Sequence, residues 1–154
     1  MTSRLDPFAA HPVTELKALG PRAVVELISI IETRAEARDE TFPAACGHLP
    51  EAWRATMLLA HVVAAFEQGD KLAEVLWDLE TPPARALIID ALREIGEKDI
   101  SAAMKNVDAN LDYGAEDVDD TAPPDGPPAP EDLARIRKKL IALVRGMDTS
   151  FPAA

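Results

Sequence analysis

The 154-residue chain is poor in cysteine, glycine and aromatic residues. Cys46 is the only cysteine, which excludes an internal disulfide and fits a reducing compartment. The seven glycines are scattered, so the chain has no Gly-rich loop of the phosphate-binding kind. Aromatic residues make up only 5% of the sequence. Ala, Leu, Ile and Val must therefore provide most of the core, which suits close packing of helices.

Long apolar runs are also lacking. Residues 1–10 contain no apolar segment of the secretory type. The most apolar stretch, residues 57–66, is interrupted by His61 and is too short to span a bilayer. The sequence therefore predicts a cytoplasmic protein that does not enter a membrane.

No pattern of catalytic or metal-binding residues is evident. The histidines, His11, His48 and His61, lie far apart, and no His-Glu-x-x-His, Cys-x-x-Cys or Glu-x-x-His spacing occurs. The thiol of Cys46 lies two residues from His48, a spacing that rarely forms a catalytic dyad. We predict no catalytic residue, no metal and no cofactor.

What the chain does have is helical periodicity along most of its length. Segments with apolar residues at helical spacing are bounded by Pro, Thr and Asp at their starts and by Gly at their ends. The predicted helices cover residues 14–20, 21–39, 50–68, 70–79, 81–96, 100–113 and 131–145. No strand-like alternation is found. We predict an all-α fold, with a loop at 41–49 and a frayed tail at 149–154.

The helix at 50–68 is apolar around most of its circumference, which predicts a central, buried position. Trp53 and Trp77 are both predicted to lie in the core. We expect a single compact domain of about six or seven helices. Residues 1–113 would form its helical core, 114–130 an acidic Pro-rich linker, and 131–148 an amphipathic helix packing back on the core.

The formal net charge is −11 and the sequence pI is near 4.6. Such a charge repels nucleic acid and favours basic protein partners. Residues 99–130 carry eight acids and one base, whereas residues 131–154 carry three acids and five bases. The negative charge is therefore concentrated before the last helix.

Three interpretations of this acidic stretch stay open. It is a solvated linker, it lies over the basic face of the last helix, or it presents a row of carboxylates to a basic partner. On the third interpretation we take the six acids between positions 108 and 120, which have no base among them, as the candidate binding residues. They are Asp108, Asp112, Glu116, Asp117, Asp119 and Asp120.

The order of several short motifs resembles a bacterial family of small, acidic, all-α proteins named for a DNA-mimic member. The motifs are Phe66-Glu67-Gln68 after the apolar helix, Ile95-Gly96 at a later helix end, and Met147-Asp148-Thr149-Ser150-Phe151 at the close. The resemblance covers about residues 49–151. It implies an all-helical domain, dimerisation, and acidic surfaces that occupy the DNA-binding face of a transcription regulator or nucleoid protein. It implies no catalytic residue.

These observations predict a non-enzymatic regulatory protein that binds a basic, DNA-binding protein partner in the manner of a DNA mimic. The alternative is an immunity or antitoxin-type inhibitor that neutralises a toxin enzyme. A third hypothesis is an enzyme that uses Cys46 or the carboxylates of Glu67 and Asp70.

Overall fold

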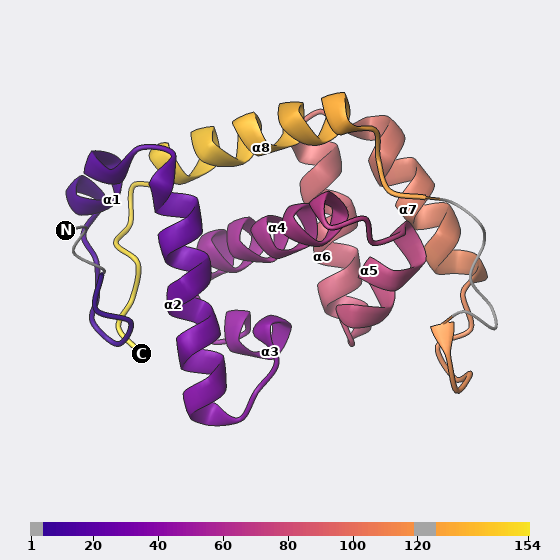
Figure 1. Cartoon of the computed structure of the whole chain (residues 1–154), viewed down its shortest axis with the longest axis horizontal. Helices are drawn as coiled ribbons and strands as arrows, with labels where there is room; N and C mark the ends of the chain where they lie inside the picture. Colours follow the sequence, from indigo (N-terminus) through magenta and orange to yellow (C-terminus); the bar gives the residue numbers. More distant parts are fainter. Residues whose placement is uncertain (1–4, 119–125) are drawn as a thin grey trace. The chain divides into compact units, whose positions relative to one another are not determined.

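The computed structural model describes residues 5–118 and 126–154. In these residues it forms eight α-helices and no strand, which confirms the predicted all-α class (Figure 1). The helices are α1 (Val13–Leu19), α2 (Arg22–Arg38), α3 (Phe42–Cys46), α4 (Glu51–Glu67), α5 (Leu72–Asp78), α6 (Pro82–Glu94), α7 (Lys98–Asn110) and α8 (Pro130–Arg145).

Local signals set most of the helix ends. Thr81 caps α6 by accepting a hydrogen bond from the backbone N–H of Ala84, and two prolines occupy its first turn. The glycines after α1, α4 and α6 (Gly20, Gly69 and Gly96) all have positive φ, the conformation that glycine adopts most readily at a helix end. The predicted positions of these ends are confirmed.

The prediction of a loop over residues 41–49 is wrong in part, because α3 lies within it. Thr41 accepts a hydrogen bond from the backbone N–H of Ala44, and Pro43 lies in the first turn of the helix. With only five residues, α3 is too short to show apolar periodicity. Its Phe42 ring stacks on the His61 ring, with the two ring centres 4.6 Å apart.

The strong burial predicted for the helix at 50–68 is confirmed for α4. Its buried residues are Trp53, Thr56, Met57, Leu58, Leu59, Ala60, Val62, Val63 and Phe66. In α8 the buried residues follow helical spacing, at Leu133, Ile136, Leu140 and Val144. The prediction for Trp77 is wrong, because its side chain is only half-buried.

The chain forms two compact units. Unit 1 comprises residues 1–61 and 137–154, and unit 2 comprises residues 62–136. The division falls within α4 and within α8, so both helices contribute to each unit. The organisation predicted from the sequence, with boundaries at 113 and 131, stays a prediction.

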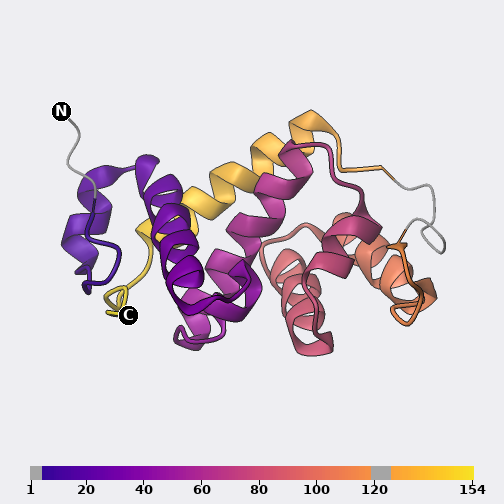
Figure 2. The same ribbon diagram turned by 60° about the horizontal axis from the view of Figure 1, so that its bottom comes forward.

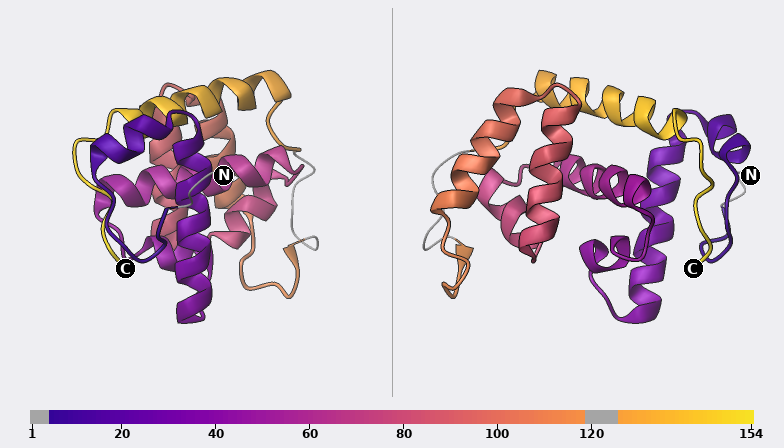
Figure 3. Two further views of the ribbon diagram at one scale, coloured as in Figure 1. Left: turned by 60° about the vertical axis from the view of Figure 1, so that its left-hand side comes forward. Right: turned by 180° about the vertical axis from the view of Figure 1, so that it is seen from behind.

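In unit 1 the two end segments of the chain run side by side, as Figures 1 and 3 show. His11 and Phe151 exchange two backbone hydrogen bonds of 2.8 Å each, and the N–H of Ala154 donates to the carbonyl of Phe8. The Phe151 ring is fully buried and meets the Trp53 ring edge-on, with the ring centres 5.2 Å apart. The expected fraying of residues 149–154 is therefore wrong.

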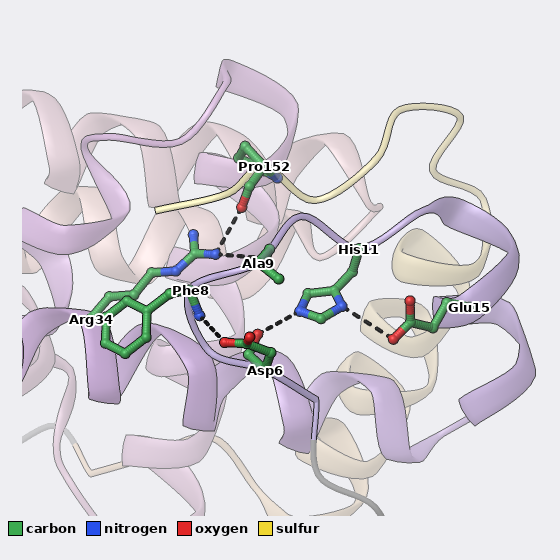
Figure 4. A network of polar contacts seen from close by, with 7 residues as sticks. All are labelled: Asp6, Phe8, Ala9, His11, Glu15, Arg34 and Pro152. Atoms are coloured by element: carbon green, nitrogen blue, oxygen red, sulfur yellow. Dashed lines mark hydrogen bonds and ion pairs between the residues drawn. The ribbon is translucent and has the colours of Figure 1, made fainter.

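Arg34 on α2 holds these end segments in place (Figure 4). Its guanidinium donates hydrogen bonds to three backbone carbonyls, those of Pro7 (2.6 Å), Ala9 (3.2 Å) and Pro152 (2.8 Å). It also lies over the Phe151 ring, 5.0 Å from the ring centre. Burial, with the nearby charge of Arg38, lowers the pKa of Arg34 from its usual value. The side chain is thus held mainly by neutral carbonyl groups.

His11 adds a second contact to the same network. Its Nε2 lies 2.7 Å from the carbonyl of Asp6, and its Nδ1 lies 3.1 Å from the carboxylate of Glu15 (Figure 4). Since both neighbouring groups can only accept, the ring donates to both of them when it is protonated.

Unit 2 is built on contacts of α7 with α5 and α6, which lie side by side with it in Figures 2 and 3. The buried hydroxyl of Ser101 on α7 donates to the carbonyl of Ile89 on α6, at 2.7 Å. Glu97, which is buried, accepts two hydrogen bonds from the guanidinium of Arg135 on α8. This bidentate pair fixes the first half of α8 in unit 2.

Replacing Phe151 by alanine tests whether the tail is part of the core. We expect Phe151→Ala to lower the free energy of unfolding by about 3–5 kcal/mol, the usual cost of deleting a buried phenyl ring. Urea titration followed by circular dichroism measures the effect.

The matched control is Phe8→Ala, because Phe8 is 48% exposed. Its expected effect is within about 0.5 kcal/mol. Equal, small effects of the two substitutions would show that the tail is frayed after all.

Candidate functional site

The four candidate acids that the structure describes differ in their surroundings. Asp108 lies on α7 and is half-buried, whereas Asp112, Glu116 and Asp117 are exposed beyond the end of that helix. Asp119 and Asp120 lie outside the described residues. The helix predicted to reach residue 113 ends at Asn110, so among the four described acids only Asp108 is fixed on it.

Asp108 makes contacts within unit 2. Its Oδ1 lies 3.4 Å from Nε of Arg85 and accepts a hydrogen bond of 2.6 Å from the hydroxyl of Tyr113. Asp108 sits in the last turn of α7, where the helix dipole disfavours a negative charge. The guanidinium of Arg85 offsets this effect. Asp108 therefore holds Arg85 and Tyr113 in place and is not a freely exposed acid.

Asp112 stabilises the turn after α7. Its Oδ1 accepts a hydrogen bond of 2.9 Å from the backbone N–H of Gly114, an interaction typical of Asx turns. This turn brings Tyr113 back towards Asp108. The segment that carries the exposed acids at 112, 116 and 117 is thus held at its start by two side-chain hydrogen bonds.

Arg85, on α6, is the central cation of this arrangement. It is only 7% exposed, and its Cζ lies 3.7 Å from the centre of the Tyr113 ring, within the range of a strong cation–π contact. The other neighbour of that ring is Trp77 on α5, whose ring centre lies 5.7 Å away. Three helices therefore contribute to one cluster, which the sequence analysis did not identify.

This cluster borders an open pocket of about 440 Å³. The lining residues are Trp77, Asp78, Glu80, Arg85 and Tyr113. Partial burial, together with the charges of Asp70, Glu74 and Glu80, raises the pKa of the Asp78 carboxyl. The pocket therefore combines aromatic rings with a concentration of negative charge.

One sequence signal could have pointed to this cluster. Arg85 occupies the same face of α6 as the buried Ile88, Ile89 and Leu92, at helical spacing. Arg34 likewise continues the apolar face of α2 that includes Leu27 and Ile31. An arginine in register with an apolar stripe signals a buried guanidinium that needs partners.

Charge is divided unequally between the two units. Residues 62–136 carry 18 acidic and six basic residues, a net charge of −12. The remaining residues, those of unit 1, carry nine acidic and ten basic residues, a net charge of +1. Unit 2 therefore accounts for all of the net negative charge of the chain.

Cys46 and His48, the pair weighed for cysteine chemistry, lie in different surroundings. Cys46 is fully buried, and burial raises the pKa of its thiol to about 12. His48 is turned to Glu40, with its Nε2 3.0 Å from the carboxylate. Within residues 5–118 and 126–154, no three His, Cys, Asp or Glu side chains gather in a way that would hold a metal ion.

None of the helices formed by the described residues combines the length and the apolar character that crossing a bilayer requires.

No family model, curated protein or solved structure matches this chain. The resemblance to the DNA-mimic family stays a prediction.

Tyr113 provides a direct test of the cluster, because it is the only tyrosine in the chain. Burial, the hydrogen bond to Asp108 and the charge of Asp108 raise its pKa well above the usual value of about 10. In an ultraviolet titration we expect no phenolate absorbance from the folded protein at pH 10–11. Asp108→Asn should lower this pKa, since Arg85 would then stabilise the phenolate unopposed.

The same shift predicts how stability depends on pH. Because folding raises the pKa of Tyr113, the neutral phenol stabilises the folded state fully below the unfolded pKa of about 10. This stabilisation is lost as pH rises further, through the pKa of the folded state.

Asp99→Asn, which removes an exposed acid from the same helix, is the control and should leave the titration of Tyr113 unchanged. Ionisation of Tyr113 near pH 10 in the folded protein would contradict the arrangement.

Cys46 should be unreactive in the folded protein. With a pKa of about 12, about one thiol in ten thousand is ionised at pH 8, and the side chain is also shielded from solvent. Ellman's reagent should therefore label Cys46 only after denaturation in urea. Rapid labelling of the native protein would show an accessible, activated thiol and would revive the hypothesis of cysteine chemistry.

Proposed function

We propose that this protein is a non-enzymatic, cytoplasmic regulatory protein that binds a basic protein partner through unit 2. The partner class that fits best is a DNA-binding protein, such as a transcription regulator or a nucleoid protein. The observation that carries the proposal is the division of charge, with −12 on unit 2 and +1 on unit 1. A field of this strength speeds the approach of cationic surfaces and repels nucleic acid.

The internal pairing of bases supports the proposal. Of the six basic residues of unit 2, Arg85 is buried against Asp108, Arg135 pairs with Glu97, and Arg93 pairs with Asp90. Arg135 also pairs with Asp132, so these three bases are held by four acids of the same unit. The other three bases of unit 2 are far outnumbered by its remaining acids, so the unit keeps a large surplus of negative charge.

The exposure of the acids supports it further. Ten described acids of unit 2 are exposed: Glu67, Asp78, Glu80, Asp90, Glu94, Asp99, Asp112, Glu116, Asp117 and Glu131. They come from several helices as well as from the segment after α7. The proposed binding surface is therefore broader than the row at 108–120, and Asp108 supports it from within.

The experiment is a pull-down from a lysate of the native organism at low and high salt, with the wild type and a triple reversal. The variant carries Asp112→Lys, Glu116→Lys and Asp117→Lys. Association of a basic partner with the variant should be about tenfold slower, and its dependence on salt should be weaker. Biosensor kinetics with the captured partner measure both effects.

Unit 1 offers a matched control. Glu32, Glu36 and Asp39 are three exposed acids on or just after α2, and their reversal to lysine changes the net charge by the same amount. We expect little effect on partner binding. Equal losses in the two variants would show that only the total charge matters. Capture of a toxin enzyme, with its activity inhibited, would identify the protein as an antitoxin-type inhibitor.

A further inference from the structure

The pocket of unit 2 has the size and position of a binding site. Its volume of about 440 Å³ lies within the usual range for small-ligand pockets, about 300–1,000 Å³. The side chains around it come from α5, from the turn after α5, from α6 and from the turn after α7. Since α5 and α6 both belong to the packed helices of unit 2, the walls are held by the core.

The charge around the pocket selects a cation. Asp78 and Glu80 line it, and Asp70 and Glu74 lie close enough to affect the ionisation of Asp78. Among the described residues that line the pocket, Arg85 is the only base, and it is already matched by the carboxylate of Asp108. A phosphate or carboxylate ligand would therefore meet uncompensated negative charge.

The rings of Trp77 and Tyr113 favour an organic cation over a metal ion in this pocket. Trp77 and Tyr113 are two of only seven aromatic residues in the chain, and both are half-buried at this pocket. Arg85 already covers one face of the Tyr113 ring, at 3.7 Å. Trp77 offers the ring that binds cations best. An organic cation on a flexible apolar stem gains from the ring and from the carboxylates together, whereas a hydrated metal ion gains little from the ring.

The backbone of Glu80 adopts a left-handed conformation at the edge of the pocket. Its φ is +71°, a conformation that non-glycine residues avoid at about 1 kcal/mol or more. Among the described residues of unit 2, the other two with positive φ, Gly69 and Gly96, are glycines at comparable helix ends. Glycine would relax the turn after α5, yet this position carries a carboxylate that lines the pocket.

We infer that the pocket lined by Trp77, Asp78, Glu80, Arg85 and Tyr113 receives the ammonium group of a lysine side chain from the basic partner. The ammonium group lies between the carboxylates of Asp78 and Glu80, and the methylene stem packs on the Trp77 ring. This inference rests on the proposed function, and it identifies an anchor point within the acidic surface of unit 2.

The probe for the test is a trilysine peptide amide with an acetylated N-terminus. Its binding is followed by the indole N–H signals of the two tryptophans in nuclear magnetic resonance spectra. Trp77 should respond in a saturable way. Trp53 is a built-in reference, since it is fully buried and its indole N–H donates to backbone carbonyls of the tail. A Trp77→Phe variant assigns the signals.

Two double variants with equal loss of charge separate the pocket from the general field of unit 2. Asp78→Asn with Glu80→Gln removes the pocket carboxylates, and Asp99→Asn with Glu94→Gln removes two exposed acids that do not line it. We expect the dissociation constant for trilysine to rise at least about tenfold in the first variant and less than about twofold in the second. Circular dichroism verifies that both variants are folded.

Other outcomes overturn the inference without touching the proposed function. Equal weakening in the two variants would mean that lysine is held by the overall charge alone. Equal binding of a trilysine peptide with acetylated side chains would mean that the ammonium group is not recognised. Conversely, pocket-specific binding of trilysine alongside a failed pull-down would support the site and refute the basic partner.

Discussion

A guanidinium removed from water must be matched by hydrogen-bond acceptors or by negative charge, and this requirement shapes both units. In unit 1, Arg34 is only 5% exposed and is satisfied by carbonyl groups from both end segments of the chain. In unit 2, Arg85 is satisfied by a carboxylate and by the face of an aromatic ring. Each arginine thereby fixes segments that have little regular structure of their own.

The different partners of Arg34 and Arg85 have different consequences. Backbone carbonyls are available wherever the chain passes, so Arg34 orders the tail mainly through its backbone, with the Phe151 ring as the one side-chain contact described above. Arg85 instead depends on Asp108 and Tyr113, and it fixes their positions in return. Because Asp108 also holds the hydroxyl of Tyr113, one carboxylate aligns both the cation and the ring. The pocket beside Trp77 is a result of this alignment.

The sequence predicts the helices well because their signals are local. The capping residue Thr81, the prolines that follow it and the glycines at helix ends act within one turn of the chain. The pinned tail could not be predicted in the same way, since Arg34 and Pro152 are 118 residues apart in sequence. Only the position of Arg34 within an apolar stripe indicates that it is buried.

The candidate site shows the same limit. Charge alone identified the acids near residue 108, because net charge is a property of composition. It could not show that Asp108 is held by Arg85 and Tyr113, or that Asp78 and Glu80 line a pocket with Trp77. Those relations arise when α5, α6 and α7 pack together, and no local pattern encodes them.

The way the chain passes through its two units sets an order on folding during synthesis. Unit 2 is one continuous stretch, residues 62–136, inserted between the two parts of unit 1. When residue 136 emerges from the ribosome, all of unit 2 has emerged. At that moment unit 1 still lacks Phe151, which belongs to its core. Unit 2 can thus fold before residues 137–154 are available to complete unit 1. During that interval Arg34 lacks its hydrogen bond to Pro152, and the indole N–H of Trp53 lacks its acceptors in the tail.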